Sequence, residues 1–265
     1  MHLSDMRLSH PPLRTMIHVM NAAHETTNQM IRGSQNMKNI YHNAPEAIDR
    51  NLMRGATLCG QLGIPEILPP KWLPSNPVFV PFSHRERRVS ESTIVCFYES
   101  DENFKDVVDH PERYIDDFSR FGAVTSPDCS MYRDAPLSHQ ISNLYLGRRA
   151  GSYLQRHGIN ILPHIRWGSR ETFTTSYFPE RIAFLGIRPH TDVAVSTYGC
   201  FHSRRDKQLF VEGFDEMIRV LQPRRIFLYG AMPKSFYAPS LFESATQTQC
   251  IHCPDWISHL HGKGK

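Results

Sequence analysis

The amino-acid sequence predicts an α/β fold with a mainly parallel sheet of about five strands flanked by helices. Short apolar runs alternate with amphipathic helical stretches from residue 93 onward, which is typical of strand-then-helix units. Each run ends in a small or polar cluster, and four of the five are followed by a helical stretch. The runs are residues 93–98, 123–126, 159–165, 192–196 and 225–229. Because five strands are too few for eight-fold closure, we expect an open three-layer sandwich rather than a barrel.

The part before residue 93 is predicted to be more loosely organised. Residues 1–55 are rich in His, Asn, Met and Gln, and apolar side chains at helical spacing predict an N-terminal helical extension. Glycine and proline are dense from residue 55 to 81, which predicts an extended loop that wraps the domain, with an edge strand near residues 78–82. Residues 56–265 are therefore expected to form a single α/β catalytic domain.

Three helical regions separate the predicted strands. Apolar side chains recur at helical spacing over residues 104–121, where Pro111 starts a second piece, and over residues 137–154 before Gly158. A third helix is expected at residues 209–221, before Pro223. Beyond Pro233 the periodicity is lost, and we expect a C-terminal tail that covers the domain.

Composition excludes several classes of protein. The chain has 265 residues, 40% of them hydrophobic and 21% charged, which is ordinary for a globular protein and argues against disorder. No apolar run approaches the roughly 18 residues that cross a bilayer, so no membrane association is expected. Six cysteines lie mostly in or beside predicted strands, which indicates reduced thiols and a cytoplasmic location.

Chemically active side chains follow the predicted strands at their carboxyl ends, where parallel α/β sheets bind ligands. The densest group is residues 126–134, and Asp128 is the first candidate for a catalytic carboxylate, with Glu99 and Asp101 as alternates. The competing interpretation is that Asp128 only caps a turn or helix. Hydroxyl, amide and aromatic side chains at the same strand ends and on the following helix predict a ligand pocket: Ser126, Ser130, Tyr132, Gln140, Asn143, Trp167, Ser196, Thr197 and Tyr198. For Trp167, burial in the core is the alternative.

Basic side chains crowd the second half of the chain although the net charge is only +4. A stripe of arginines suits a partner that carries phosphates, whereas solvated helix faces are the simpler explanation. The candidates for phosphate contacts are Arg148, Arg149, Arg170, Arg204, Arg205 and Lys207.

Metal and cofactor motifs are weak. Cys250, Cys253, His259 and His261 offer zinc-ligand types, but the spacing from Cys253 to the two histidines is tighter than in zinc fingers. There is no Walker phosphate loop, no dinucleotide fingerprint after a strand and no serine nucleophile elbow. We therefore expect no cofactor and no bound metal.

From residue 60 to 230 the chain resembles a bacterial and phage-associated family, the domain of unknown function number 4417. The resemblance rests on the order and spacing of several short motifs. These are Gly63-Ile64-Pro65, Pro81-Phe82, Ser126-Pro127-Asp128-Cys129-Ser130, Gln140 to Asn143 with Arg148, Gln155 with Gly158, Pro163 with Trp167, Ser196-Thr197 with Gly199, and Leu228-Tyr229-Gly230.

The resemblance implies a DNA glycosylase of antiphage defence that removes modified bases from viral DNA. In that case the carboxylates above stabilise a cationic sugar, the polar and aromatic side chains form a pocket for a flipped base, and the basic ones hold phosphates. DNA, in particular phage DNA with modified bases, is the expected partner. Two other hypotheses stay open: a metal-dependent nuclease or hydrolase built on Glu99, Asp101, Asp128 and nearby histidines, and a non-catalytic module that binds nucleic acid or a nucleotide.

Overall fold

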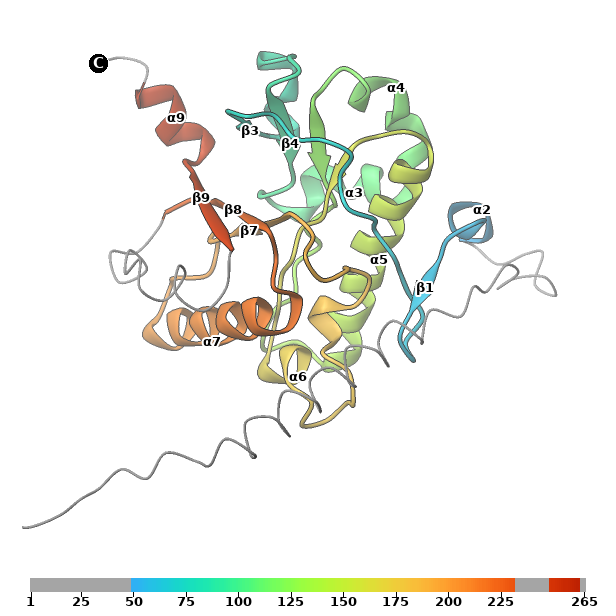
Figure 1. Cartoon of the computed structure of the whole chain (residues 1–265), viewed down its shortest axis with the longest axis vertical. Coiled ribbons are helices and arrows are strands. Elements are labelled where there is room, and N and C mark those ends of the chain that lie inside the picture. The colour runs from blue at the N-terminus through green and yellow to red at the C-terminus, as the bar shows by residue number, and fades with distance from the viewer. Residues whose placement is uncertain (1–48, 232–247, 263–265) are drawn as a thin grey trace, which may run out of the picture.

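The computed structural model describes residues 49–231 and 248–262 (Figure 1). Most of the predicted N-terminal extension lies outside these residues, and its described end contains the short helix α2 (Arg50–Met53). None of the described helices is long and apolar enough to span a membrane.

Seven parallel strands form the centre of the molecule. They pair as a four-stranded and a three-stranded ladder, in the order β3 (Val78–Pro81), β4 (Thr93–Cys96), β5 (Ala123–Thr125), β6 (Ile161–Leu162), and β7 (Val193–Ser196), β8 (Arg225–Tyr229), β9 (Gln249–Cys253). The two ladders meet just beyond β6, where the amide of Ile165 donates to the carbonyl of Ala194 at 2.9 Å and the amide of Ala194 donates to that of Pro163 at 2.8 Å. The strands therefore follow one another across the sheet in chain order.

Every predicted strand run contains an observed strand, and the proposed edge strand is β3 at one end of the order. Strand β9 was not predicted, because its residues fall in the stretch expected to be a covering tail. Its polar Gln249 and His252 interrupt the apolar pattern, and as an edge strand it needs only one ladder, with β8.

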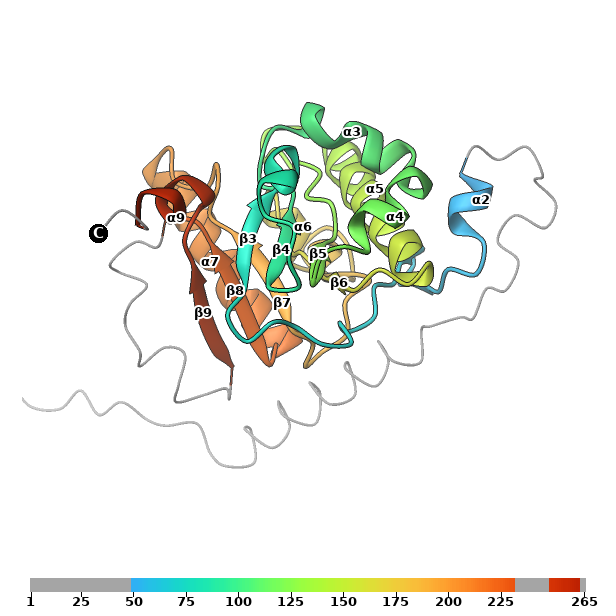
Figure 2. The ribbon, with the colours of Figure 1, turned by 90° about the horizontal axis from the view of Figure 1, so that it is seen from above.

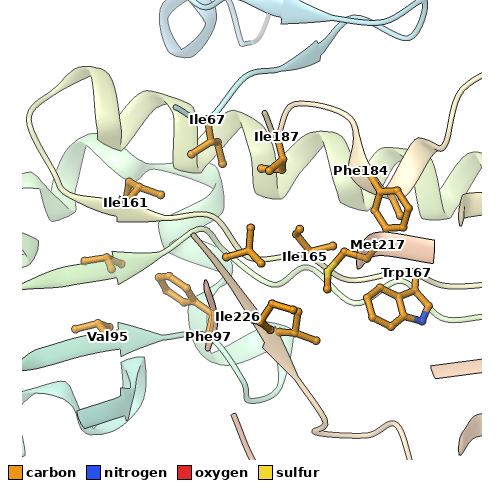
Figure 3. Packing of buried hydrophobic residues seen from close by; sticks show 14 of the residues in the cluster. Ile67, Val95, Phe97, Ile161, Ile165, Trp167, Phe184, Ile187, Met217 and Ile226 are labelled. Atoms are coloured by element: carbon orange, nitrogen blue, oxygen red, sulfur yellow. The ribbon is translucent and has the colours of Figure 1, made fainter. Parts of the chain in front are cut away.

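The main helices pack on one side of the sheet. They are α3 (Asp101–Asp109), α4 (Ile115–Phe118), α5 (Leu137–Arg156), α6 (Arg170–Phe173) and α7 (Arg204–Leu221). Figure 2 shows α3, α4 and α5 beside β4 to β6, and α7 alongside the strands of the second ladder. Their apolar side chains share one core with residues in or shortly after the strands, among them Phe97, Ile165 and Ile226 (Figure 3).

The opposite face of the sheet packs against itself. Its buried cluster draws side chains from all seven strands or the residues directly after them, and no described helix contributes to it. Phe79 of β3 lies 6.3 Å from Phe227 and 5.9 Å from Tyr229 of β8, measured between ring centroids. The sheet is therefore strongly curled, yet β3 and β9 do not pair, and the described residues form no closed barrel. The predicted α/β class, with a parallel sheet flanked by helices and no closed barrel, is confirmed. The main helices lie on one face of the curled sheet, whereas a three-layer sandwich has helices on both faces.

The glycine- and proline-rich loop does wrap the domain. It contains a small antiparallel ladder and is tied to distant parts of the chain by hydrogen bonds, such as that from the amide of Ile67 to the carbonyl of Gly186 at 2.9 Å. The remaining short elements are β1 (Leu58–Cys59), β2 (Ile64–Pro65), η1 (Phe82–Arg87), η2 (Pro111–Tyr114), η3 (Ile182–Phe184) and α9 (Trp256–Gly262).

Candidate active site

A cavity of about 420 Å³ opens at the carboxyl ends of β4 to β7, the edge at which parallel sheets bind ligands. Strand-end turns from four strands converge there, because strands in chain order bring their following loops to one rim. Eight of the predicted site residues line the cavity: Glu99, Asp101, Asp128, Ser130, Tyr132, Trp167, Ser196 and Tyr198.

Asp128 lies at the bottom of the cavity in a buried ion pair. Its side chain is 3% exposed, and Arg166 donates to both carboxylate oxygens, from Nε to Oδ1 at 2.5 Å and from Nη2 to Oδ2 at 2.7 Å. Burial disfavours the charged carboxylate, but the charge of Arg166 and the contact with His164 outweigh burial and hold the pKa of Asp128 well below its usual range. Asp128 thus stays ionised with both oxygens engaged, which suits it to fixing Arg166 rather than to activating a water.

Two further buried side chains extend this pair into the curled sheet. His164 Nε2 lies 2.9 Å from Asp128 Oδ1, although its direction is poor for a hydrogen bond, and the Tyr98 hydroxyl lies 3.2 Å from His164 Nδ1. Burial lowers the pKa of His164, so the imidazole is neutral at pH 7. We call Asp128, Arg166, His164 and Tyr98 the floor cluster.

Glu99 and Asp101 also line the cavity and are held by neutral donors. Glu99 accepts hydrogen bonds from the Ser83 amide at 2.9 Å and from Asn103 Nδ2 at 2.8 Å. Asp101 accepts from the amide of Ser130 at 3.0 Å and from its hydroxyl at 2.8 Å. These bonds fix the carboxylates in place without cancelling their charge.

Asp134 is a third carboxylate in the lining of the cavity, and we call Glu99, Asp101 and Asp134 the rim carboxylates. In the part of the chain that the structure describes, no lysine or arginine lies within ion-pair distance of them. The other charged residues of the lining are matched, because Arg133 contacts Asp206 as Arg166 contacts Asp128. The cavity therefore carries an excess of negative charge.

Aromatic rings form the walls. Tyr132 and Tyr198 are each 57% exposed, whereas Trp167 is only 9% exposed and packs against Phe210 with ring centroids 5.2 Å apart. A Cβ on Gly213 of α7 would lie 2.3 Å from Trp167 Nε1, so the indole needs a glycine beneath it. Trp167 is thus both a core residue and part of the cavity wall, so the predicted pocket position and the alternative of burial in the core both hold.

Several predicted pocket residues brace the site from behind and do not line it. Gln140 Oε1 accepts from the amide of Ser169 at 2.9 Å, and Asn143 Nδ2 donates to the carbonyl of Ser130 at 2.6 Å. Ser126 Oγ accepts from the amide of His164 at 2.9 Å, and Thr197 Oγ1 donates to the Tyr229 carbonyl at 3.2 Å. Their polar atoms hold the strand-end turns in position, so direct contact with a ligand is not supported for them.

The structure overturns the assignment of Arg148 and Arg149 to a DNA-contacting surface. Both are buried in α5, and Arg149 donates to the carbonyl of Val108 at 3.0 Å. Arg148 donates to three backbone carbonyls, those of Leu185, His164 and Ala183. Burial lowers the pKa of Arg148 to about 10. Helix α5 is packed on several sides, so its arginines satisfy buried carbonyls instead of facing solvent.

The other predicted phosphate ligands remain exposed or partly exposed. Arg170 pairs with Glu212 at 2.5 Å, whereas Arg204, Arg205 and Lys207 begin α7 with no ion-pair partner among the described residues. They stand beside cavity-lining residues at the start of the same helix.

The zinc ligand set is not assembled. Cys250 packs against the core that the strands share with the helices, and Cys253 packs in the cluster on the opposite face of the sheet. The two side chains diverge because residues three apart in a strand point to opposite faces. His259 lies on α9, and the side chain of His261 is outside the described part. Among the described residues, no three His, Cys, Asp or Glu side chains gather in a way that could hold a metal ion.

Sequence reasoning missed Arg166, His164, Tyr98 and Cys200 as site residues. Tyr98 and His164 lie in predicted strands, Arg166 directly follows one, and Cys200 lies in the turn after one, which is the signal that could have found them. Cys200 lines the cavity, its thiol donates to the carbonyl of Tyr198 at 3.5 Å, and burial raises the pKa of that thiol.

Comparisons with known proteins place the chain near phage proteins. A family model described as "Domain of unknown function (DUF4417)" matches residues 56–241. The Gene 1 protein of Mycobacterium phage D29 is 32% identical over 170 residues, which cover 64% of this chain and 60% of the phage protein. The Gene 1 protein of Mycobacterium phage L5 is 31% identical over 149 residues, or 56% of this chain and 62% of the relative. The chain thus spans about 60% of the length of these curated relatives. No solved structure matches.

Proposed function

The chain belongs to the DUF4417 family, and we propose that it is a DNA glycosylase that hydrolyses the N-glycosidic bond of a base flipped out of phage DNA. The product is an abasic site, and the biological role in this proposal is antiviral defence. The observation that carries the proposal is the lining of the cavity at the strand ends: carboxylates without a cationic partner, aromatic walls and one rigidly held arginine.

The rim carboxylates supply what the reaction needs at the sugar. As the bond between the base and the sugar breaks, positive charge develops on the anomeric carbon, and a fixed negative charge nearby lowers the barrier. Glu99 and Asp101 are held by four hydrogen bonds from neutral donors, so they need no reorganisation as the charge appears. One of them also accepts the proton of the attacking water.

The walls and the floor cluster suit a flipped base. Tyr132 and Tyr198 offer exposed ring faces for stacking, and Trp167 closes the wall between them and α7. Arg166 is partly exposed at the floor and cannot rotate freely, because Asp128 holds two of its nitrogens. Its remaining donors can bind acceptors on the base edge.

The flanking backbone needs a separate, basic surface, because the cavity itself repels phosphates. Arg204, Arg205 and Lys207 at the start of α7 provide that surface next to the cavity. This arrangement lets a base enter while its phosphates stay outside.

The test is release of free base from DNA by the full chain. Normal and modified duplexes are incubated with the protein, and free base and alkali-labile sites are detected by mass spectrometry and gel electrophoresis. We expect Glu99→Gln and Asp101→Asn to reduce the rate of base release by about 100-fold or more, within the range for charge-stabilising groups. Glu102→Gln is the matched control, since Glu102 adjoins Asp101 on α3 but is exposed and does not line the cavity.

Other outcomes would contradict the proposal. Direct strand breaks that vanish with a chelator would indicate a metal-dependent nuclease. If DNA binds but no base is released from any duplex, the chain is a binding module instead.

A further inference from the structure

From the charge of the cavity we infer that the base it binds carries a positive charge, in its ring or on an ammonium substituent. This inference rests on the proposed function and names its substrate class. Three features point to such a base: the charge balance of the lining, the aromatic walls and the way in which a charged base leaves.

The charge balance is set by which carboxylates have cationic partners. Asp128 is matched by Arg166 and Asp206 by Arg133, whereas the rim carboxylates Glu99, Asp101 and Asp134 are unmatched among the described residues. A neutral base would leave these three negative charges uncompensated in the lining of the cavity. A cationic base would compensate this charge, and the attraction is strengthened by the low local dielectric constant.

The aromatic walls favour the same ligand. A cation within about 6 Å of a tyrosine or tryptophan ring face is attracted by the quadrupole of the ring. Tyr132, Tyr198 and Trp167 line the same cavity as the unmatched carboxylates. Rings combined with carboxylates recognise a cation more strongly than either group does alone, because each attracts it through a different interaction.

A ring cation also leaves more easily. The bond between the anomeric carbon and the base nitrogen breaks, its electron pair neutralises the ring charge, and water adds to the carbon while its proton passes to a rim carboxylate. A neutral base must instead leave as an anion or be protonated. The floor cluster does not provide that proton, because Asp128 is held ionised and His164 is held neutral.

Binding of free nucleosides to the full chain tests the inference without requiring catalysis or phosphate contacts. Two matched pairs separate the two sources of charge: 7-methylguanosine against guanosine, and 5-aminomethyl-2′-deoxyuridine against 5-hydroxymethyl-2′-deoxyuridine. By isothermal titration calorimetry we expect the cationic member of at least one pair to bind about tenfold more tightly. A preference confined to the first pair identifies a ring cation, and one confined to the second identifies an ammonium substituent.

Variants connect the preference to the cavity. Asp134→Asn should remove most of it, since Asp134 is exposed and its loss does not disturb the floor cluster, and Glu102→Gln should preserve it. Equal binding of charged and neutral members, or binding of none, would overturn the inference. A preference for cations without base release from any DNA would instead overturn the proposed function and leave the inference standing.

Discussion

The floor cluster and the rim carboxylates lie in one cavity but differ in how their charges are matched. In the floor, Asp128 has a bidentate arginine, a histidine contact and almost no exposure. At the rim, Glu99 and Asp101 have only neutral donors, and Asp134 has no described cationic partner.

The difference separates residues that build the site from residues that await a ligand. A buried charge without a partner is strongly destabilising, so the floor must be complete before anything binds. Rim charges reach solvent and tolerate the lack of a partner. The charge most prominent in the sequence, Asp128, therefore belongs to the scaffold, and in the proposed function the alternates Glu99 and Asp101 act on the substrate.

The largest effect on stability is expected from Asp128→Ala in the floor cluster. It leaves Arg166 buried without its carboxylate, and we expect the free energy of unfolding to fall by about 3–5 kcal/mol. Asp134→Asn at the rim should change it by no more than about 0.5 kcal/mol. Urea unfolding followed by circular dichroism measures both, and equal losses would show that floor and rim do not differ.

A smaller effect is expected from Gly213→Ala, which acts on the cavity wall. An unobstructed glycine in a helix gains about 1 kcal/mol of stability on replacement by alanine. Here the new Cβ would lie 2.3 Å from Trp167 Nε1, so we expect a loss of about 1–3 kcal/mol and a shift in tryptophan fluorescence. Ser142→Ala on the exposed side of α5 is the control and should be neutral or slightly stabilising. A stabilised Gly213→Ala would show that the indole can move away without cost.

The pH dependence of stability tests the floor cluster separately from the rim carboxylates, because His164 belongs to the floor cluster. Its pKa is lowered in the fold from 6.5, so below about pH 6.5 the unfolded chain binds a proton that the folded chain does not. The free energy of unfolding should therefore fall as the pH drops from 7 to 5, by up to about 1.4 kcal/mol per unit for this group. Asp128, whose pKa is also lowered, contributes stability that is lost only at pH values below 3.8.

His164→Gln should flatten this slope, and the exposed His202→Gln should not. The slope is compared at matched denaturant concentrations, so any overall loss of stability in the variant does not affect the conclusion. An unchanged slope in His164→Gln would mean that the floor histidine is not held neutral by the fold.

The strand pattern was sufficient to predict where the site forms. Apolar runs with polar ends identify parallel strands, and their ends meet at one rim, so Asp128, Trp167 and Tyr198 line one cavity as their positions implied. The sequence does not reveal which acid has a cationic partner. Arg166 lies 38 residues from Asp128 along the chain, and only the register of neighbouring strands brings them together.

Burial of polar side chains was the second limit of sequence reasoning. Helical periodicity places Arg148 and Arg149 next to each other, but it does not indicate that α5 is enclosed on several sides, so their hydrogen bonds to carbonyls were not foreseen. Strand β9 was missed because its stability comes from pairing with β8 rather than from its own composition.

Arg204 and Arg205 carry charge on the surface of the molecule, outside the cavity, and their contact with DNA can be tested separately. If Arg204 and Arg205 each contact a DNA phosphate, their joint replacement by alanine should reduce the slope of log affinity against log salt by about 1.8, at about 0.9 per contact. Arg113→Ala is the control, because Arg113 is exposed on η2 and paired with Asp106. Fluorescence anisotropy with a labelled duplex at several salt concentrations gives the slopes. An unchanged slope in the double variant would remove the start of α7 from the interface, and a reduced slope in Arg113→Ala would place the DNA over η2 instead.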